Sequence, residues 1–336
     1  MEILSDPSAE DLKHYDTWLH TCAQGTLWQS LEWKKYQEAI GRGTRLYLAR
    51  EKGAIVASAL VVIDTTTFGL STWDIPRGPI WDLGLRTGDL GELLKTIVND
   101  AKKNRCLCLY LSPPIPLPDL KSQVPSPLSS VLRSSLRHEQ PEASSVIDLM
   151  KSEEEIRAEM KPKGRYNISV AKRHHVIVRQ SSDIAVFLKL AEETANRDGF
   201  KAPPKSHYRA FLEHLRGSFL LLAYPENSSE PISGLLGVIW GSQGIYYYGA
   251  SSHASRALMA PYLLQWEAMR HSKALGCTSY DLFGIAPPDA PSHHPWKGVT
   301  DFKEKFGGKT ILYPPEQVIA LRPMLKALLA LKRKVF

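Results

Sequence analysis

The sequence contains few cysteines, no long apolar run and no N-terminal secretion signal. Its 336 residues include four cysteines, and no two of them have the spacing of a zinc knuckle. We therefore interpret Cys22, Cys106, Cys108 and Cys277 as free thiols in a reducing compartment. No stretch of about 18 apolar residues is present, so no transmembrane segment is expected. The N-terminus lacks the basic and apolar stretches of a signal peptide, which favours a cytoplasmic location.

The composition is typical of a globular protein that is large enough for two domains. Hydrophobic residues make up 43% and charged residues 23% of the chain. This is enough apolar material for two packed cores of about 150 residues each. The formal net charge of +7 favours polyanionic partners such as RNA, diphosphates or an anionic membrane. Charge alone leaves open a basic protein that binds none of these.

Hydrophobic periodicity predicts a mixed α/β protein with domains over residues 1–145 and 146–336. In the first domain, the expected helices are 11–22, 31–40 and 85–103, and the expected strands are 45–50, 55–63, 72–75 and 107–111. The turn Glu51-Lys52-Gly53 makes the first two strands a hairpin. Prolines between residues 113 and 127 exclude regular structure from the segment 112–141.

The second domain shows the element order of a GNAT-type acyltransferase fold. Its expected helices are 153–160, 166–174, 184–197, 206–216 and 257–275, with a basic loop before the second of them. Its expected strands are 146–149, 176–180, 219–224, 232–240, 244–248 and 278–283. The first half shows a shorter version of this order. Since the sequence itself contains no repeat, a duplicated GNAT fold is a hypothesis about structure.

Five short motifs occur in order along most of the chain. They are Leu27-Trp-Gln-Ser-Leu-Glu-Trp-Lys-Lys-Tyr36, Pro76-Arg-Gly-Pro79, Lys161-Pro-Lys-Gly-Arg-Tyr-Asn-Ile168 with Ala171-Lys-Arg173, the segments 247–252, 259–267 and 280–285, and Phe302-Lys-Glu-Lys-Phe-Gly-Gly308. Each motif is weak alone, but their joint occurrence in this order is specific. The chain therefore resembles the FemABX family of aminoacyl-tRNA-dependent peptidyltransferases.

The resemblance implies two GNAT-like domains with an active cleft between them. It also implies transfer of glycine, alanine or serine from aminoacyl-tRNA to the stem-peptide amine of a peptidoglycan precursor. That acceptor is either lipid II or UDP-MurNAc-pentapeptide, and no cofactor is expected. Some family members carry a long helical hairpin in the second domain. No charged, heptad-rich run of that length is present, so we expect the compact form without it.

A Phe-Lys pair near the end of the second domain is the strongest catalytic candidate. In the family, this lysine stabilises the oxyanion that forms when an amine attacks an ester, and Phe302 and Lys303 match the pair. One such donor is worth about 3 kcal/mol. Lys305 is a near neighbour with which Lys303 is easily confused. Asp281 follows Tyr280 at the end of an expected strand, where it serves either the catalytic site or a turn.

Several cations are candidates for binding phosphate groups. The resemblance assigns the acceptor diphosphate to a lysine after Trp33, which is Lys34 or Lys35, and we favour Lys35. A basic cluster either binds the phosphates of the tRNA acceptor stem or forms a solvated helical face. Its members are Lys161, Lys163, Arg165, Lys172 and Arg173.

Two tyrosines of the second domain also match family positions. Tyr248 matches a tyrosine of the cleft, and Tyr208 matches a phosphate-site tyrosine that an arginine should precede. That arginine is missing. Lys205 or Lys201 replaces it only as a point charge, because lysine lacks the bidentate fork of arginine. This departure leaves the identity of the acceptor open.

Two other functions stay open, and a metal site is not expected. The histidines lack the partner carboxylates and spacing of a metal site. A CoA-dependent N-acyltransferase needs a glycine-rich helix start, but Met259 and Pro261 occupy that position. The other alternative is a non-catalytic module that binds tRNA or lipid diphosphates. The basic amphipathic tail 325–334 either contacts the inner membrane face or packs as a terminal helix.

Overall fold

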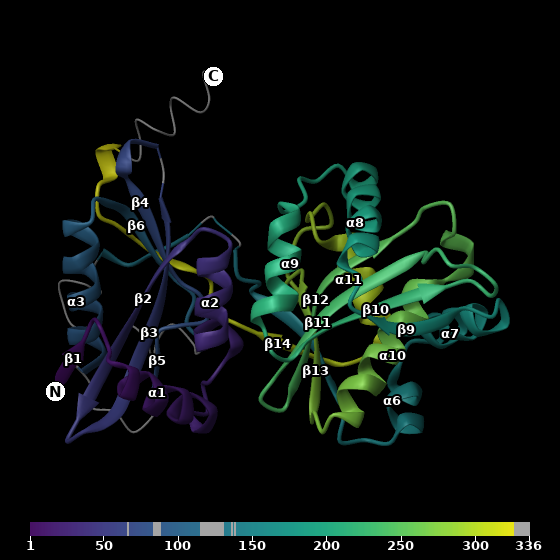
Figure 1. Ribbon diagram of the computed structural model, residues 1–336, viewed down its shortest axis with the longest axis horizontal. Coiled ribbons are helices and arrows are strands. Elements are labelled where there is room, and N and C mark those ends of the chain that lie inside the picture. The colour runs from purple at the N-terminus through teal and green to yellow at the C-terminus, as the bar shows by residue number, and fades with distance from the viewer. Residues whose placement is uncertain (66, 83–88, 115–130, 136, 138, 326–336) are drawn as a thin grey trace. The chain divides into compact units, whose positions relative to one another are not determined.

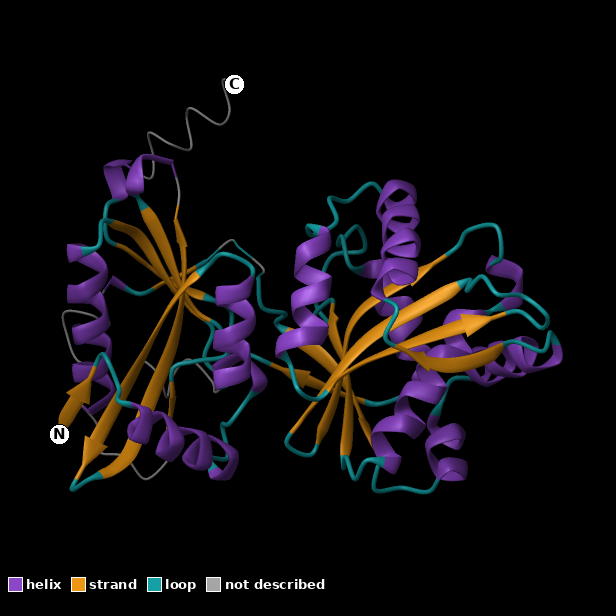
Figure 2. Ribbon diagram, in the orientation of Figure 1, coloured by secondary structure: helices purple, strands orange, loops and turns teal. Residues whose placement is uncertain are grey.

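The computed structural model describes residues 1–336 except 66, 83–88, 115–130, 136, 138 and 326–336. The chain divides into two compact units, each built on one β-sheet covered by helices (Figures 1 and 2). Unit 1 joins Met1–Glu142 to the segment that begins at Tyr313, and unit 2 is Ala143–Leu312. This is the mixed α/β architecture that the periodicity predicts.

Unit 1 contains an eight-stranded sheet of order β1-β2-β3-β4-β6-β15-β7, with β5 paired to β3. Its strands are β1 (Glu2–Leu4), β2 (Gly43–Glu51), β3 (Ala54–Thr65), β4 (Ser71–Ile75), β5 (Ile80–Trp81), β6 (Cys106–Leu111), β7 (Arg133–Ser134) and β15 (Gln317–Ala320). Its helices are α1 (Ala9–Thr21), α2 (Leu31–Ala39) and α3 (Asp89–Lys103), with short turns η1 (Leu27–Gln29) and η2 (Thr67–Gly69). Figure 1 shows α3 on one face of the sheet and α2 on the other.

Local sequence signals account for several of these elements. The side chain of Ser8 caps α1, and Asp11 completes a capping box. Ser30 caps α2 by accepting the N–H of Trp33 at 3.0 Å. The predicted β2–β3 hairpin turns at Lys52 and Gly53, whose φ angles of 49° and 85° are the left-handed values that a tight hairpin requires.

An ionic cluster ties the segment after Tyr313 to unit 1. Strand β15 pairs with β6, and the neighbouring Glu316 accepts hydrogen bonds from the Arg137 guanidinium at 3.0 and 3.1 Å. The same guanidinium contacts the carboxylate of Asp74 on β4. Burial raises the pKa of Asp74 to about 6, although Arg137 opposes this shift. Unit 2 therefore ends at Leu312, whereas the predicted second domain extends over 146–336.

Unit 2 contains a seven-stranded sheet of order β14-β8-β13-β12-β11-β10-β9. Its strands are β8 (Ala143–Asp148), β9 (Ile177–Ser181), β10 (Ser218–Tyr224), β11 (Ser233–Trp240), β12 (Gln243–Ser251), β13 (Ser279–Ile285) and β14 (Lys309–Leu312). Its helices are α6 (Glu153–Glu159), α7 (Pro162–Arg173), α8 (Ile184–Asp198), α9 (Lys205–His214), α10 (Ala260–Ala274) and α11 (Lys297–Lys303), with turns η3 (Arg256–Leu258) and η4 (Glu304–Phe306). Figure 1 shows α8 and α9 on one face of the sheet, and α6, α7 and α10 on the other.

The helices of unit 2 are all short. The longest, α8 and α10, have 15 residues each, and every residue of 143–312 is described. Unit 2 therefore has the predicted compact form without a long helical hairpin. Across the described parts of both units, no helix is long and apolar enough to cross a membrane.

Four of the five sequence motifs make close contacts in two pairs. The side-chain amide of Gln29, in the first motif, donates to the carbonyl of Pro76 in the second motif at 2.7 Å. A Cβ on Gly78 would stand 2.6 Å from that amide nitrogen, so only glycine fits there. In unit 2, a Cβ on Gly164 of the third motif would stand 2.2 Å from the carbonyl oxygen of Lys305 in the fifth. Close backbone approach thus explains part of the motif pattern.

The structure contains five elements that the sequence did not predict, namely β1, β5, α11, β14 and β15, and it differs from the prediction in three further segments. Residues 161–165, expected in a loop, begin α7, because Pro162 suits the first turn of a helix, where its missing N–H is not needed. The helix expected over 257–275 is divided by Met259, whose φ is 52°. The segment 112–141 contains the short strand β7, while residues 115–130 and most of the predicted tail lie outside the described residues.

Candidate functional site

Strands β12 and β13 of unit 2 separate after a short parallel contact. They pair over three positions, from Gln243 opposite Ser279 to Ile245 opposite Asp281. Their connection is the crossover helix α10, as parallel neighbours require. Beyond these positions β12 continues beside β11, and β13 continues beside β8. The remaining ends of the two strands therefore present backbone groups that do not pair with each other.

A bulge in β13 shapes one side of this region. The pairing of β13 with β8 passes from Asp281 opposite Val146 to Gly284 opposite Ser144, so β13 has an extra residue. Within the bulge, Phe283 has a φ of 60°, which costs about 1–2 kcal/mol for a residue with a side chain. The carboxylate of Asp281 accepts the N–H of Phe283 at 2.7 Å and the hydroxyl of Ser144. These hydrogen bonds stabilise the bulge.

Lys303, the predicted catalytic lysine, is buried against this bulge. It ends α11, and it is only 6% exposed. Its ammonium donates to the carbonyl oxygens of Phe283 at 3.1 Å and Gly284 at 2.7 Å. Burial lowers the pKa of Lys303 to about 8, and the negative charge of Asp281 opposes this shift. Lys303 is therefore not a solvated surface lysine, and Asp281 is part of its surroundings.

Tyr246 connects this lysine to a cavity. The Lys303 amine lies 5.5 Å from the centre of the Tyr246 ring. A second bulge, with the extra residue Tyr247, shifts the pairing of β12 with β11 at this point. Burial raises the pKa of Tyr246 to about 12, while a hydrogen bond with Gln265 on α10 opposes this shift. A Cβ on Gly249 would stand 1.8 Å from the Tyr246 hydroxyl, so glycine is required for this arrangement.

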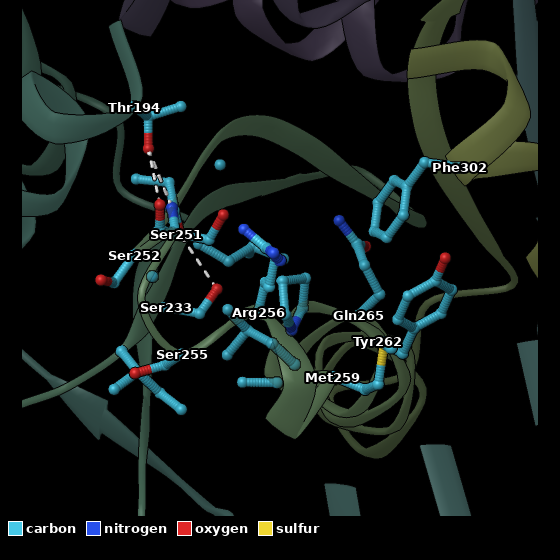
Figure 3. Close-up of a pocket in the computed structure, with 18 of the residues that line it drawn as sticks. Thr194, Ser233, Ser251, Ser252, Ser255, Arg256, Met259, Tyr262, Gln265 and Phe302 are labelled. Atoms are coloured by element: carbon cyan, nitrogen blue, oxygen red, sulfur yellow. Dashed lines mark hydrogen bonds between the residues drawn. The ribbon is translucent and has the colours of Figure 1, made fainter. Parts of the chain in front are cut away.

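The cavity has a volume of about 300 Å³ and lies at the start of α10 (Figure 3). Residues of α8, β11, β12 and α10 line it together with Phe302. The rings of Phe302 and Tyr262 pack 5.1 Å apart and form an apolar wall. Polar side chains that line the rest include Thr194, Ser233, Ser252, Arg256 and Gln265. The cavity therefore combines aromatic rings with hydroxyl, amide and guanidinium groups.

The first turn of α10 is poorly suited to a diphosphate. No side chain caps it, Met259 precedes it in a left-handed conformation, and Pro261 removes one backbone N–H donor. A pyrophosphate at a helix N-terminus is held by such donors. This geometry agrees with the sequence argument against CoA at this position.

Tyr208 and Tyr248, both predicted to bind substrate, lie together. Their ring centres are 4.8 Å apart, and they come from α9 and β12. The adjacent Tyr247 stacks on Phe283 at 5.4 Å, which extends this aromatic cluster to the bulge that holds Lys303. The structure therefore brings the two predicted tyrosines close to the lysine environment, on the α9 side of β12.

The remaining predicted substrate residues belong to α2 of unit 1 and to α9 of unit 2. Trp33, Lys34 and Lys35 are on α2 of unit 1, where Trp33 is buried. Lys34 forms an ion pair with Glu38 at 2.6 Å, whereas Lys35 is exposed. Lys205, predicted to replace a missing arginine, forms an exposed ion pair with a glutamate of α8 at 3.4 Å.

The five basic residues predicted to bind tRNA have different surroundings. Lys161 forms an exposed ion pair with Glu304 at 2.6 Å. Arg165 donates to the carbonyl of Ala158 at 3.1 Å and so helps to close the end of α6. The other three are exposed on α7: Lys163, Lys172 and Arg173. Among the described residues, no group of three or more His, Cys, Asp or Glu side chains is arranged to hold a metal ion.

Sequence reasoning did not identify Ser144, Tyr246 or Phe283. Ser144 lies 137 positions from Asp281 along the chain, and no local pattern links the two. Tyr246 begins a run of three tyrosines in which alternation assigns it the same face as Tyr248. The bulge at Tyr247 breaks this alternation. The tyrosine run itself was the one available signal for this part of the site.

Comparison with known proteins gives both a family match and structural matches. The model of the FemAB family matches residues 11–127, 132–226 and 222–334. The lipid II:glycine glycyltransferase of Staphylococcus epidermidis is 36% identical over 84 residues, which are 24% of this chain and 20% of the relative. The match to this curated relative thus spans about a fifth of its length.

Two solved structures show the fold. The crystal structure of FemX has a TM-score of 0.81 at 17% identity, and the match covers 98% of this chain and 99% of that one. A tandem GNAT protein from the clavulanic acid biosynthesis pathway has a TM-score of 0.55 at 12% identity, over 95% and 98% of the chains. The predicted fold of two GNAT-like domains is therefore confirmed.

Proposed function

The chain belongs to the FemAB family, and we propose that it transfers an amino acid from aminoacyl-tRNA to an amine on the stem peptide of a peptidoglycan precursor. The observation that best supports this activity is the buried ammonium of Lys303 beside an aromatic cavity. Glycine as the amino acid and lipid II as the acceptor are the first pair to test, because the name of the S. epidermidis relative contains both.

In the proposed reaction, the acceptor amine attacks the carbonyl carbon of the aminoacyl ester. A C–N bond forms, the C–O bond to the ribose breaks, and the amine proton passes to the departing ribose oxygen. The intermediate carries an oxyanion that a nearby cation stabilises. Two N–H groups of the Lys303 ammonium are engaged by the carbonyls of Phe283 and Gly284, which leaves one for the oxyanion. The carbonyls thus hold the cation in position before the substrates bind.

We further propose that the cavity of unit 2 receives the aminoacylated 3′ end of tRNA. The rings of Phe302 and Tyr262 suit a nucleobase, which stacks on aromatic side chains. The hydroxyl and amide groups among the other lining residues suit a ribose and a base edge. For the phosphates of the acceptor stem, the exposed cations of α7 are the best candidates, since α7 packs against α10. Arg173 also lies 5.6 Å over the exposed ring of Tyr166.

Lys35→Ala is expected to raise the KM for the peptidoglycan precursor about 5-fold while kcat stays nearly constant. An exposed lysine that binds a diphosphate acts on substrate affinity and not on the transition state. Lys34→Ala is the matched control, because Lys34 is already paired with Glu38. Steady-state kinetics with varied acceptor measures both values. Equal effects of the two substitutions would contradict the assignment of the diphosphate to Lys35.

The proposed activity is tested by incubating the protein with tRNA charged with radiolabelled glycine, alanine or serine. Lipid II and UDP-MurNAc-pentapeptide serve as parallel acceptors, and acetyl-CoA is the control donor. Label in either acceptor supports the proposal and identifies the acceptor. Folded protein that labels neither acceptor from any tRNA would overturn it, and transfer from acetyl-CoA would instead support an N-acyltransferase.

A further inference from the structure

One end of the unit 1 sheet combines exposed apolar side chains with cations. At this end β3 leads through η2 into β4, α3 leads into β6, and β15 ends (Figure 1). Phe68 in η2 is 72% exposed, and Met324 after β15 is 80% exposed. They are two of the three most exposed large apolar side chains among the described residues.

Local backbone geometry favours the exposure of Phe68. Its φ is 67°, a left-handed value that is uncommon for a residue with a side chain, and the following Gly69 is also left-handed at 64°. Gly69 lies close to Arg105, whose guanidinium is 3.8 Å from the position of a Cβ on Gly69. The aromatic ring and the arginine therefore belong to the same small surface.

Cations surround these apolar side chains. Lys102, Lys103 and Arg105, at the end of α3, are all exposed. Arg322, two residues before Met324, donates to the carbonyl of Lys102 at 3.1 Å, which links the segment after β15 to the same end. Of these cations, Lys103 is paired with the half-buried Asp100 at 3.4 Å. We name this surface of Phe68, Lys102, Lys103, Arg105, Arg322 and Met324 the basic end.

We propose that the basic end docks on an anionic lipid bilayer, with Phe68 and Met324 inserted among the lipid headgroups. Cations that flank exposed apolar side chains are the pattern of proteins that rest on such a surface. RNA also attracts the cations, and the ring of Phe68 suits base stacking, but Met324 has no ring that stacks on a base. The combination of both apolar side chains therefore favours lipid. The proposal deepens the proposed function, because a lipid-linked acceptor lies at a membrane surface.

The test is sedimentation of the full chain with vesicles, with phosphatidylcholine alone compared with an equimolar mixture of phosphatidylglycerol and phosphatidylcholine. We expect binding to the mixed vesicles, weakened by salt because the attraction is electrostatic. Phe68→Ser/Met324→Ser and Lys102→Gln/Lys103→Gln are each expected to lower this binding by about 10-fold. The matched control is Lys13→Gln/Lys52→Gln, which removes the same charge near the β2–β3 turn, at the other end of β3, and is expected to bind like the wild type.

Equal losses of vesicle binding in the control and in the basic-end variants would overturn the proposal. Net charge or the basic tail 325–334 would then explain the binding. Loss of tRNA binding instead of vesicle binding in Lys102→Gln/Lys103→Gln would also overturn the proposal and assign the surface to RNA. Vesicle binding requires no substrate, so Lys303→Met is expected to retain it. If the wild-type protein binds vesicles but transfers no amino acid, only the proposed function is contradicted. If it transfers the amino acid but does not bind vesicles, only the docking surface is contradicted.

Discussion

Lys303→Met is expected to lower kcat/KM for amino acid transfer by about 10²–10³-fold, which corresponds to the loss of one oxyanion donor. Methionine fills a similar volume and carries no charge, so the buried site between α11 and the β13 bulge stays packed. The carbonyls of Phe283 and Gly284 lose their donor, but the main loss is the cation that we propose stabilises the transition state. Transfer of radiolabelled amino acid under single-turnover conditions measures the effect.

Two further substitutions make this test specific. Lys305→Met is the matched control, because Lys305 is two positions away and its ammonium donates to the carbonyl of Asp301 near the surface. It is expected to keep activity within about 2-fold of the wild type. Lys303→Arg is expected to remain impaired, since the larger guanidinium does not fit a buried site shaped for one ammonium. Comparable losses in Lys303→Met and Lys305→Met would contradict the catalytic assignment.

Asp281→Ala is expected to lower transfer activity by about 10²-fold, because the N–H of Phe283 and the hydroxyl of Ser144 both lose their acceptor. The left-handed conformation of Phe283 then lacks its stabilising hydrogen bond, and the two carbonyls no longer hold Lys303 in one position. The second-site control is Ser145→Ala, since Ser145 donates to the carbonyl of Gly307 and not to Asp281. Circular dichroism of both variants reports whether they fold. Reduced activity in a folded Asp281→Ala variant then indicates that Lys303 is no longer held in position.

Asp281→Asn tests the electrostatic part of the same arrangement through the pH profile. The pKa of Lys303 is about 8, so the ammonium is present below this pH and activity is lost as the pH rises through it. The charge of Asp281 raises this pKa, and its removal moves the alkaline limb of the profile to lower pH. The amide oxygen of asparagine still accepts both hydrogen bonds. The activity of Asp281→Asn is therefore expected to approach that of the wild type at acidic pH. An unchanged alkaline limb would contradict a role for Lys303 as the ammonium.

Most of the order of helices and strands was determined by the sequence alone, although the pattern did not predict β1, β5, α11, β14 or β15. The hairpin at Lys52 and Gly53 depends on residues close in the chain, so the pattern predicts it directly. The helix caps at Ser8 and Ser30 are equally local. The family motifs likewise made Lys303 the catalytic candidate. These features depend on residue types at short spacing, which a single sequence displays.

The surroundings of that lysine were decided only by the tertiary structure. Its burial depends on a bulge that Asp281 and Ser144 hold together from 137 positions apart, and bulges are not encoded in strand alternation. Because strand alternation also does not encode the bulge at Tyr247, the sequence did not predict that Tyr246, and not Tyr248, contacts the ammonium. Nor did it predict that β15 returns to unit 1, because the pairing of β15 with β6 joins segments about two hundred residues apart. Candidate residues could thus be named from residue types, while their geometry depended on pairings that form only in the folded chain.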